Sequence, residues 1–143
     1  MQRLITTAAT IFVLGVGSLQ VQTQAQTTTS TATLGTARIS SAVMADGKTL
    51  PAGTYQVRLT TTTPAKVVGQ TVEETRWIEF MRGGTVAGRE VATVVSQAVI
   101  DEIKDRPAPG GAVSVQTLRG GDYLRVWMKH SGTHYLIHLP KGR

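Results

Sequence analysis

The sequence predicts an all-β protein. The expected fold is an antiparallel β-sandwich of about seven strands, immunoglobulin-like or transthyretin-like, with a small β-barrel as the alternative. Short runs of alternating apolar and polar residues recur along the chain, and segments containing Gly or Pro separate them at fairly regular spacing. No segment of normal helical length carries a helical pattern. The length of 143 residues suits one domain, and the pattern leaves sandwich and barrel both open.

The clearest element is a β-hairpin at the C-terminal end, where two alternating segments flank a Ser131-Gly132 turn. Counting outward from this turn pairs Lys129 with His134 and Arg125 with His138. One face is almost wholly apolar and should form core: Leu124, Val126, Met128, Tyr135, Ile137 and Leu139. The other face should be solvated: Tyr123, Arg125, Trp127, Lys129, His134, Leu136 and His138. A slip of one residue would exchange the two faces, so burial should hold the register.

The N-terminal segment, residues 1–25, has the layout of a secretory signal peptide. Arg3 gives a positive start, residues 4–16 are mostly apolar, and Thr23-Gln24-Ala25 offers a small-x-small cleavage site. Residues 26–33 are polar and of low complexity, which predicts a disordered lead before a folded domain at 34–143. The protein is therefore expected to be periplasmic or secreted, with no transmembrane segment after signal cleavage. Whether the signal is cleaved stays open.

The other strands are predicted at residues 37–44, 54–60, 76–81, 85–96 and 112–118. Turns rich in Gly separate them at residues 45–48, 50–53, 82–84 and 119–121. Gly88 predicts a bulge, so the register of the hairpin at 76–96 stays open. Trp77 and Glu79 are expected to point outward, and one helical turn is possible at 100–104.

Residues 46–57 read Asp-Gly-Lys-Thr-Leu-Pro-Ala-Gly-Thr-Tyr-Gln-Val. This segment resembles the G-K-x-L-P-A-G-T-Y-x-V segment of uncharacterised small secreted bacterial β-domain proteins, and more loosely that of carboxypeptidase-regulatory-like and transthyretin-like sandwiches. The resemblance implies an exported sandwich in which a Pro-Gly turn begins a strand with Tyr55 inward. It implies no activity.

Composition excludes several classes of function. The chain has no Cys, which excludes disulfides, thiol catalysis and thiolate metal sites. The formal charge is +6, which could attract anionic lipid, polysaccharide or nucleic acid. The basic residues are spread singly, however, which favours a role in solubility, and no nucleic-acid partner is expected. An envelope protein or a polysaccharide is a conceivable partner, and the oligomeric state is unknown.

The sequence contains no convincing catalytic or metal-binding pattern. His130, His134 and His138 are close in sequence, but strand residues four apart lie ~13 Å from each other, too far to share one ion. There is no nucleophile elbow, phosphate loop or calcium loop. We expect no metal, no cofactor and no catalytic residue. A hydrolase that uses His134 or His138 is the weakest hypothesis.

The best functional candidate is the outer face of the C-terminal hairpin, because exposed aromatic rings beside cations can stack on sugars or anchor a protein partner. Its expected binding residues are Tyr123, Arg125, Trp127, Lys129, His134 and His138. Trp77 could extend this face if its strand is a neighbour. Alternatively, Trp127 only stiffens the sheet or is covered by a loop.

The sequence thus favours an exported, non-catalytic β-sandwich with a binding or structural role in the periplasm or cell envelope. The alternative is a small-ligand carrier with a β-barrel cavity. That cavity would be lined by residues such as Tyr55, Phe80, Met128 and Tyr135.

Overall fold

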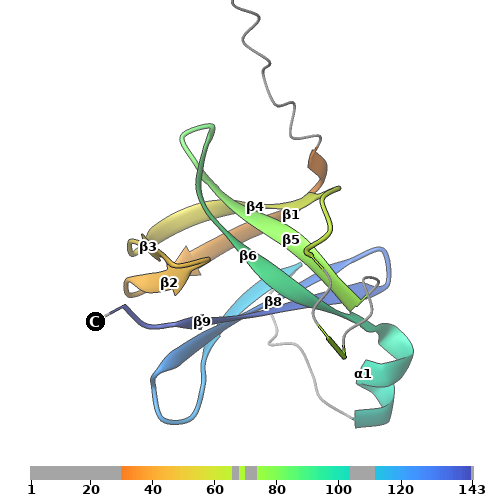
Figure 1. The fold of residues 1–143 in the computed structure, drawn as a ribbon. Coiled ribbons are helices and arrows are strands. Elements are labelled where there is room, and N and C mark those ends of the chain that lie inside the picture. Colours follow the sequence, from red (N-terminus) through yellow and green to blue (C-terminus); the bar gives the residue numbers. More distant parts are fainter. Residues whose placement is uncertain (1–29, 66–67, 70–73, 104–111, 143) are drawn as a thin grey trace, which may run out of the picture.

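The computed structural model describes residues 30–65, 68–69, 74–103 and 112–142. This part of the chain is almost entirely β, as predicted, with one short helix (Figure 1). Its strands are β1 (Ser30–Ile39), β2 (Val43–Ala45), β3 (Lys48–Leu50), β4 (Gly53–Thr60), β5 (Thr75–Arg82), β6 (Thr85–Ser96), β7 (Val113–Thr117), β8 (Tyr123–His130) and β9 (Thr133–Pro140). The helix α1 (Gln97–Ile103) follows β6 directly.

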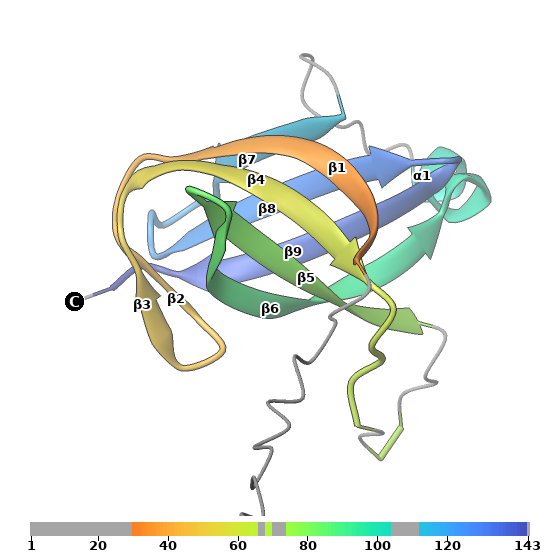
Figure 2. The ribbon, with the colours of Figure 1, turned by 90° about the horizontal axis from the view of Figure 1, so that it is seen from above.

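Seven strands form one antiparallel sheet in the order β1-β4-β5-β6-β9-β8-β7. The sheet curls so strongly that its two end strands, β1 and β7, come into contact (Figure 2). At this seam Gly35 faces Val113 so closely that a Cβ on Gly35 would lie 2.7 Å from Val113 Cγ2. The antiparallel all-β class is therefore confirmed. Of the two predicted architectures, the nearly closed barrel is the one that describes this sheet.

The C-terminal hairpin β8–β9 has the predicted register, with Lys129 opposite His134 and Arg125 opposite His138. Ser131 and Gly132 have φ angles of 49° and 75°, the positive values that a two-residue type I′ turn needs. All six residues of the predicted core face are buried. Alternation and turn chemistry thus define this hairpin together.

The four residues expected to line a ligand cavity lie instead in the continuous hydrophobic core. Tyr55, Phe80 and Met128 are fully buried, and Tyr135 is nearly so. Tyr55 packs edge-on against Phe80 with ring centroids 6.2 Å apart, and its hydroxyl donates to the Pro51 carbonyl at 2.6 Å. Packed side chains fill the barrel interior at these positions.

The small hairpin β2–β3 lies at one end of the barrel and packs on β6 (Figure 2). It buries Leu50 completely, and a Cβ on Gly88 would come within 3.2 Å of Leu50 Cδ1. The predicted bulge is present at this glycine, because the pairing changes from Phe80 with Gly88 to Met81 with Val86. Glycine here makes room for the β2–β3 hairpin.

Several predicted boundaries need correction. β1 begins at Ser30, before the expected domain start at 34, and the predicted strand 37–44 is divided between β1 and β2. The predicted signal peptide 1–25 and most of the polar lead lie outside the described residues. The predicted helical turn belongs to α1, which starts three residues earlier, at Gln97 instead of residue 100.

Glu79 has the predicted outward orientation, but it is buried, with only 6% of its surface exposed. It lies on the outer side of the sheet, opposite Arg58, and the two side chains form an ion pair at 2.9 Å. Trp77 is half-buried, with the Arg89 guanidinium 4.3 Å from its ring centroid. A cross-strand ion pair and a cation–π contact therefore lie on this side of the barrel.

Candidate functional site

The outer face of β8–β9 is divided into a buried part and an exposed part. Trp127 is 2% exposed and His134 is 0% exposed, whereas Tyr123 is 47% exposed. The expectation that Trp127 and His134 face solvent is therefore wrong. The reason is the path of β6, which pairs Val95 with His134 and then turns directly into α1 beside it.

A directional chain of hydrogen bonds runs through the buried part. The Trp127 indole Nε1–H donates to His134 Nδ1 at 2.8 Å. Because an indole N–H can only donate, His134 Nδ1 must accept, so the ring is neutral and carries its hydrogen on Nε2. His134 Nε2 then donates to Gln97 Oε1 at 2.8 Å, and Gln97 Nε2 donates to Asp101 Oδ1 at 2.8 Å.

These hydrogen bonds connect both strands of the hairpin to α1 and occupy both ring nitrogens of His134. Burial lowers the pKa of His134, the nearby charge of Lys129 lowers this pKa further, and Asp101 opposes these effects. The arrangement keeps the imidazole neutral and fixes its position. It does not support the hypothesis of a hydrolase that uses His134.

The exposed part centres on Tyr123, Arg125 and His138. Arg125 Nε donates to His138 Nε2 at 3.1 Å, so this nitrogen of His138 is unprotonated. Partial burial of the His138 ring lowers its pKa, and the Arg125 charge lowers this pKa further.

A shallow cleft of about 470 Å³ adjoins Tyr123 and is lined by Asp122, Tyr123, Pro140, Lys141 and Gly142. Tyr123 pairs with Pro140 across the hairpin, and the Lys141 backbone N–H donates to the Asp122 carbonyl at 2.8 Å. The exposed or half-buried residues of this region form a set that we call the Tyr123 strip: Tyr123, Arg125, His138, Asp122 and Lys141. The sequence did not single out Asp122 or Lys141, although both flank the ends of the predicted hairpin.

The other two expected members of the face lie elsewhere. Lys129 is exposed, but it sits opposite His134 and is ~13 Å along the strand from Arg125. Trp77 lies on β5, and β6 and β9 separate that strand from β8. The structure thus brings Tyr123, Arg125 and His138 together and places Lys129 and Trp77 apart from them.

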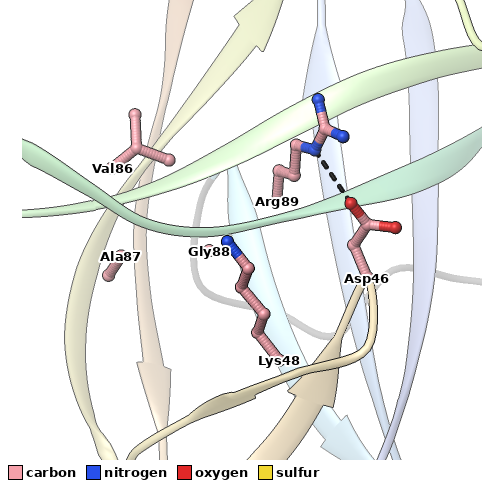
Figure 3. Close-up of a pocket in the computed structure, with 6 residues that line it drawn as sticks. All are labelled: Asp46, Lys48, Val86, Ala87, Gly88 and Arg89. Carbon is pink, nitrogen blue, oxygen red and sulfur yellow. Dashed lines mark hydrogen bonds and ion pairs between the residues drawn. The ribbon is translucent and has the colours of Figure 1, made fainter.

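A second cleft, of about 220 Å³, lies between the β2–β3 turn and the bulge in β6 (Figure 3). Its lining residues are Asp46, Lys48, Val86, Ala87, Gly88 and Arg89. Arg89 Nε bonds Asp46 Oδ2 at 2.9 Å, and the Asp46 backbone N–H donates to Glu90 Oε2 at 2.7 Å. These paired charges fasten the small hairpin to β6, which is a structural use of the cleft.

No group of three or more His, Asp or Glu side chains in the described ranges is placed to hold a metal ion. The one described helix, α1, is too short to cross a membrane. Comparisons with protein-family models, with curated proteins and with solved structures find no match for this chain.

Proposed function

We propose that this protein is an exported, non-catalytic β module that binds an anionic polysaccharide of the periplasm or cell envelope through the Tyr123 strip. The observation that carries the proposal is the half-exposed Tyr123 ring beside an open cleft. An aromatic face can stack on the apolar face of a sugar ring, while its polar rim stays hydrated.

The charges around Tyr123 favour an acidic sugar. Arg125 and Lys141 supply positive charge, and Arg125 presents a planar guanidinium that suits a carboxylate. Asp122 can accept hydrogen bonds from sugar hydroxyls. The formal charge of the full chain, +6, agrees with an anionic ligand, although its basic residues are spread singly.

Export is supported by the signal-like residues 1–25 and is consistent with a chain that has no Cys. The resemblance of residues 46–57 to small secreted β-domain proteins agrees with this proposal. Secretion of the full chain into the periplasm of a bacterial host, followed by mass determination of the mature N-terminus, tests it. A product that keeps Met1 and stays with the cytoplasmic fraction would contradict export.

Binding can be tested with alginate, an anionic uronic-acid polymer, and with an uncharged glucan as the reference polymer. We expect Tyr123→Ala to weaken alginate affinity roughly tenfold in isothermal titration, since one stacked ring contributes about 0.5–1.5 kcal/mol beyond its buried area. Tyr123→Phe should retain most of the affinity. Val86→Ala is the matched control, because Val86 is also 47% exposed but lies on β6, outside the Tyr123 strip.

Wild-type affinity in the Tyr123→Ala variant would rule out this strip as the binding face. Equal affinity for alginate and the uncharged glucan would rule out the anionic preference. Arg125→Ala should reduce both the affinity and its dependence on salt, as expected when a screened ionic contact is lost.

A further inference from the structure

The helix α1 starts beside the buried part of the hairpin, where Gln97 bonds His134, and it has few stabilising features of its own. It has seven residues, no acidic side chain in its first turn and no basic side chain in its last. Only Ile100 is buried, while Val99 and Ile103 are 45% and 59% exposed. A helix this short is not stable alone, so its contacts with the barrel must hold it.

A chain of side-chain hydrogen bonds ties α1 to the hairpin through one residue of the helix. Gln97, the first residue of α1, accepts from His134 Nε2, and His134 Nδ1 accepts from Trp127 Nε1. The covered residue Trp127 lies two positions along β8 from Arg125, on the same face. Removal of α1 would therefore place a second large aromatic ring beside the Tyr123 strip.

We propose that α1 is an acid-sensitive cover, which a proton on His134 Nδ1 releases from the hairpin so that Trp127 becomes exposed next to the Tyr123 strip. The use of this cover rests on the proposed function, because opening would enlarge the same binding face. The opening itself needs no ligand.

The chemistry at His134 predicts that the cover opens in acid and stays closed at neutral pH. A protonated imidazole carries hydrogen on both nitrogens, so Nδ1 would face the Trp127 N–H as donor against donor. The positive charge would also sit in a site with 0% exposure. Lys129 on β8 opposes this charge, and among the residues that the structure describes Asp101 on α1 favours it.

The sign of the pH effect follows from the lowered pKa of His134. The covered state binds the proton less well than the uncovered state, in which the ring is hydrated and titrates near its ordinary value of 6.5. The covered state is therefore fully favoured above pH 6.5 and loses stability as the pH falls below that value.

Fluorescence of Trp127 can test the cover in a Trp77→Phe background, since the chain has two tryptophans. We expect acrylamide quenching of Trp127 to rise several-fold between about pH 7.5 and about pH 5, while the β-sheet circular dichroism is unchanged. Adding His134→Gln should abolish this pH response. Adding His138→Gln, the matched control on the same strand, should leave it in place.

Trp127 that is equally protected at both pH values would overturn the proposal. A loss of sheet signal at the same midpoint would also overturn it, because the whole domain would then unfold instead of the cover opening.

Hydrogen exchange provides a second readout that does not depend on the tryptophan. We expect the amides of α1 to lose protection in acid, after correction for intrinsic rates, while those of β8 and β9 keep it. Gln97→Ala should show this pattern already at about pH 7.5, because His134 Nε2 loses its acceptor. Full protection of α1 in that variant would contradict the proposed tie.

Neither measurement contains a polysaccharide. If Trp127 opens in acid but Tyr123→Ala binds alginate normally, the cover stands and only the proposed binding face is overturned. If Tyr123→Ala fails to bind and Trp127 stays closed, the binding face stands and the cover is overturned.

Discussion

Two histidines, His134 and His138, lie on the same face of the same strand, yet only one of them is in water. His138 accepts from Arg125 and is exposed, whereas His134 accepts from Trp127 and is buried. The difference comes from the neighbouring strand. The β6–β9 ladder ends at Ser96 and Thr133, so α1 leaves β6 beside His134, and its first residue, Gln97, bonds this histidine. Exposure on a sheet face therefore depends on where the chain goes after the adjacent strand, as well as on the strand's own alternation.

The largest difference in the free energy of unfolding should be that between the Trp127→Ala and Tyr123→Ala variants. Trp127→Ala removes a fully packed ring and should cost about 3–5 kcal/mol in the free energy of unfolding, measured by urea denaturation. Tyr123→Ala removes a half-exposed ring and should change it by less than about 0.5 kcal/mol. Trp127 would then act as a packed residue, whereas the sequence pattern predicts it on an exposed binding face. Similar stability losses in the two variants would contradict the division of this face into a buried and an exposed part.

The second largest difference in the free energy of unfolding should be that between the His134→Ala and His138→Ala variants. His134→Ala leaves Trp127 Nε1–H and the side-chain oxygen of Gln97, Oε1, without their partner. It should lower the free energy of unfolding by about 1–3 kcal/mol at neutral pH. His138→Ala removes only an exposed contact and should be close to neutral. Urea titrations of the two single variants measure the contrast. A greater loss in His138→Ala would reverse our assignment.

A smaller effect should come from Gln97, the residue that links His134 to α1. Gln97→Ala removes the acceptor for His134 Nε2 and should cost about 0.5–1.5 kcal/mol. Gln56 is exposed on β4, so Gln56→Ala serves as the surface control. Thermal unfolding of both variants, compared with wild type, measures the difference. Equal midpoints would mean that the link from α1 contributes nothing to stability.

The pH dependence of stability sharpens the same comparison. The pKa of His134 and that of His138 are both lowered, so the unfolded chain binds protons more readily than the folded one. Stability should therefore fall as the pH drops below 6.5, and the slope should be smaller in His134→Gln. Denaturation midpoints across this range measure the slope. A wild-type slope in His134→Gln would assign the effect to other groups.

Local patterns predict the inner face of the C-terminal hairpin in full. Six apolar side chains alternate around a two-residue turn, and every one of them is buried in the predicted register. Gly88 likewise predicts its bulge, although the reason for it, the approach of Leu50, comes from a separate hairpin. Such features can be predicted because neighbouring residues decide them.

The outer face could be predicted only in part, because a distant segment decides its burial. Tyr123, Arg125 and His138 come together as their alternation suggests, but Trp127 and His134 do not share their exposure. Ser96, whose Oγ accepts from the Val99 N–H at 3.4 Å, is a local signal that a helix starts there. No local signal tells which surface that helix will cover.

The sequence pattern leaves the choice between barrel and sandwich open because this choice, too, depends on distant segments. It depends on the contact of Gly35 with Val113, at opposite ends of the sheet. Strand patterns specify which side chains face inward, but they do not specify how far a sheet curls.

The seam at Gly35 also bears on how the chain acquires its structure. Its two residues are 113 − 35 = 78 positions apart, so loop-closure entropy makes their meeting one of the costliest steps in folding. If the chain is exported with its N-terminus leading, β1 emerges well before β7 is available. Until then its edge is a template for pairing with other chains. Translocation faster than aggregation, or a chaperone that shields β1, would then decide how much native protein accumulates.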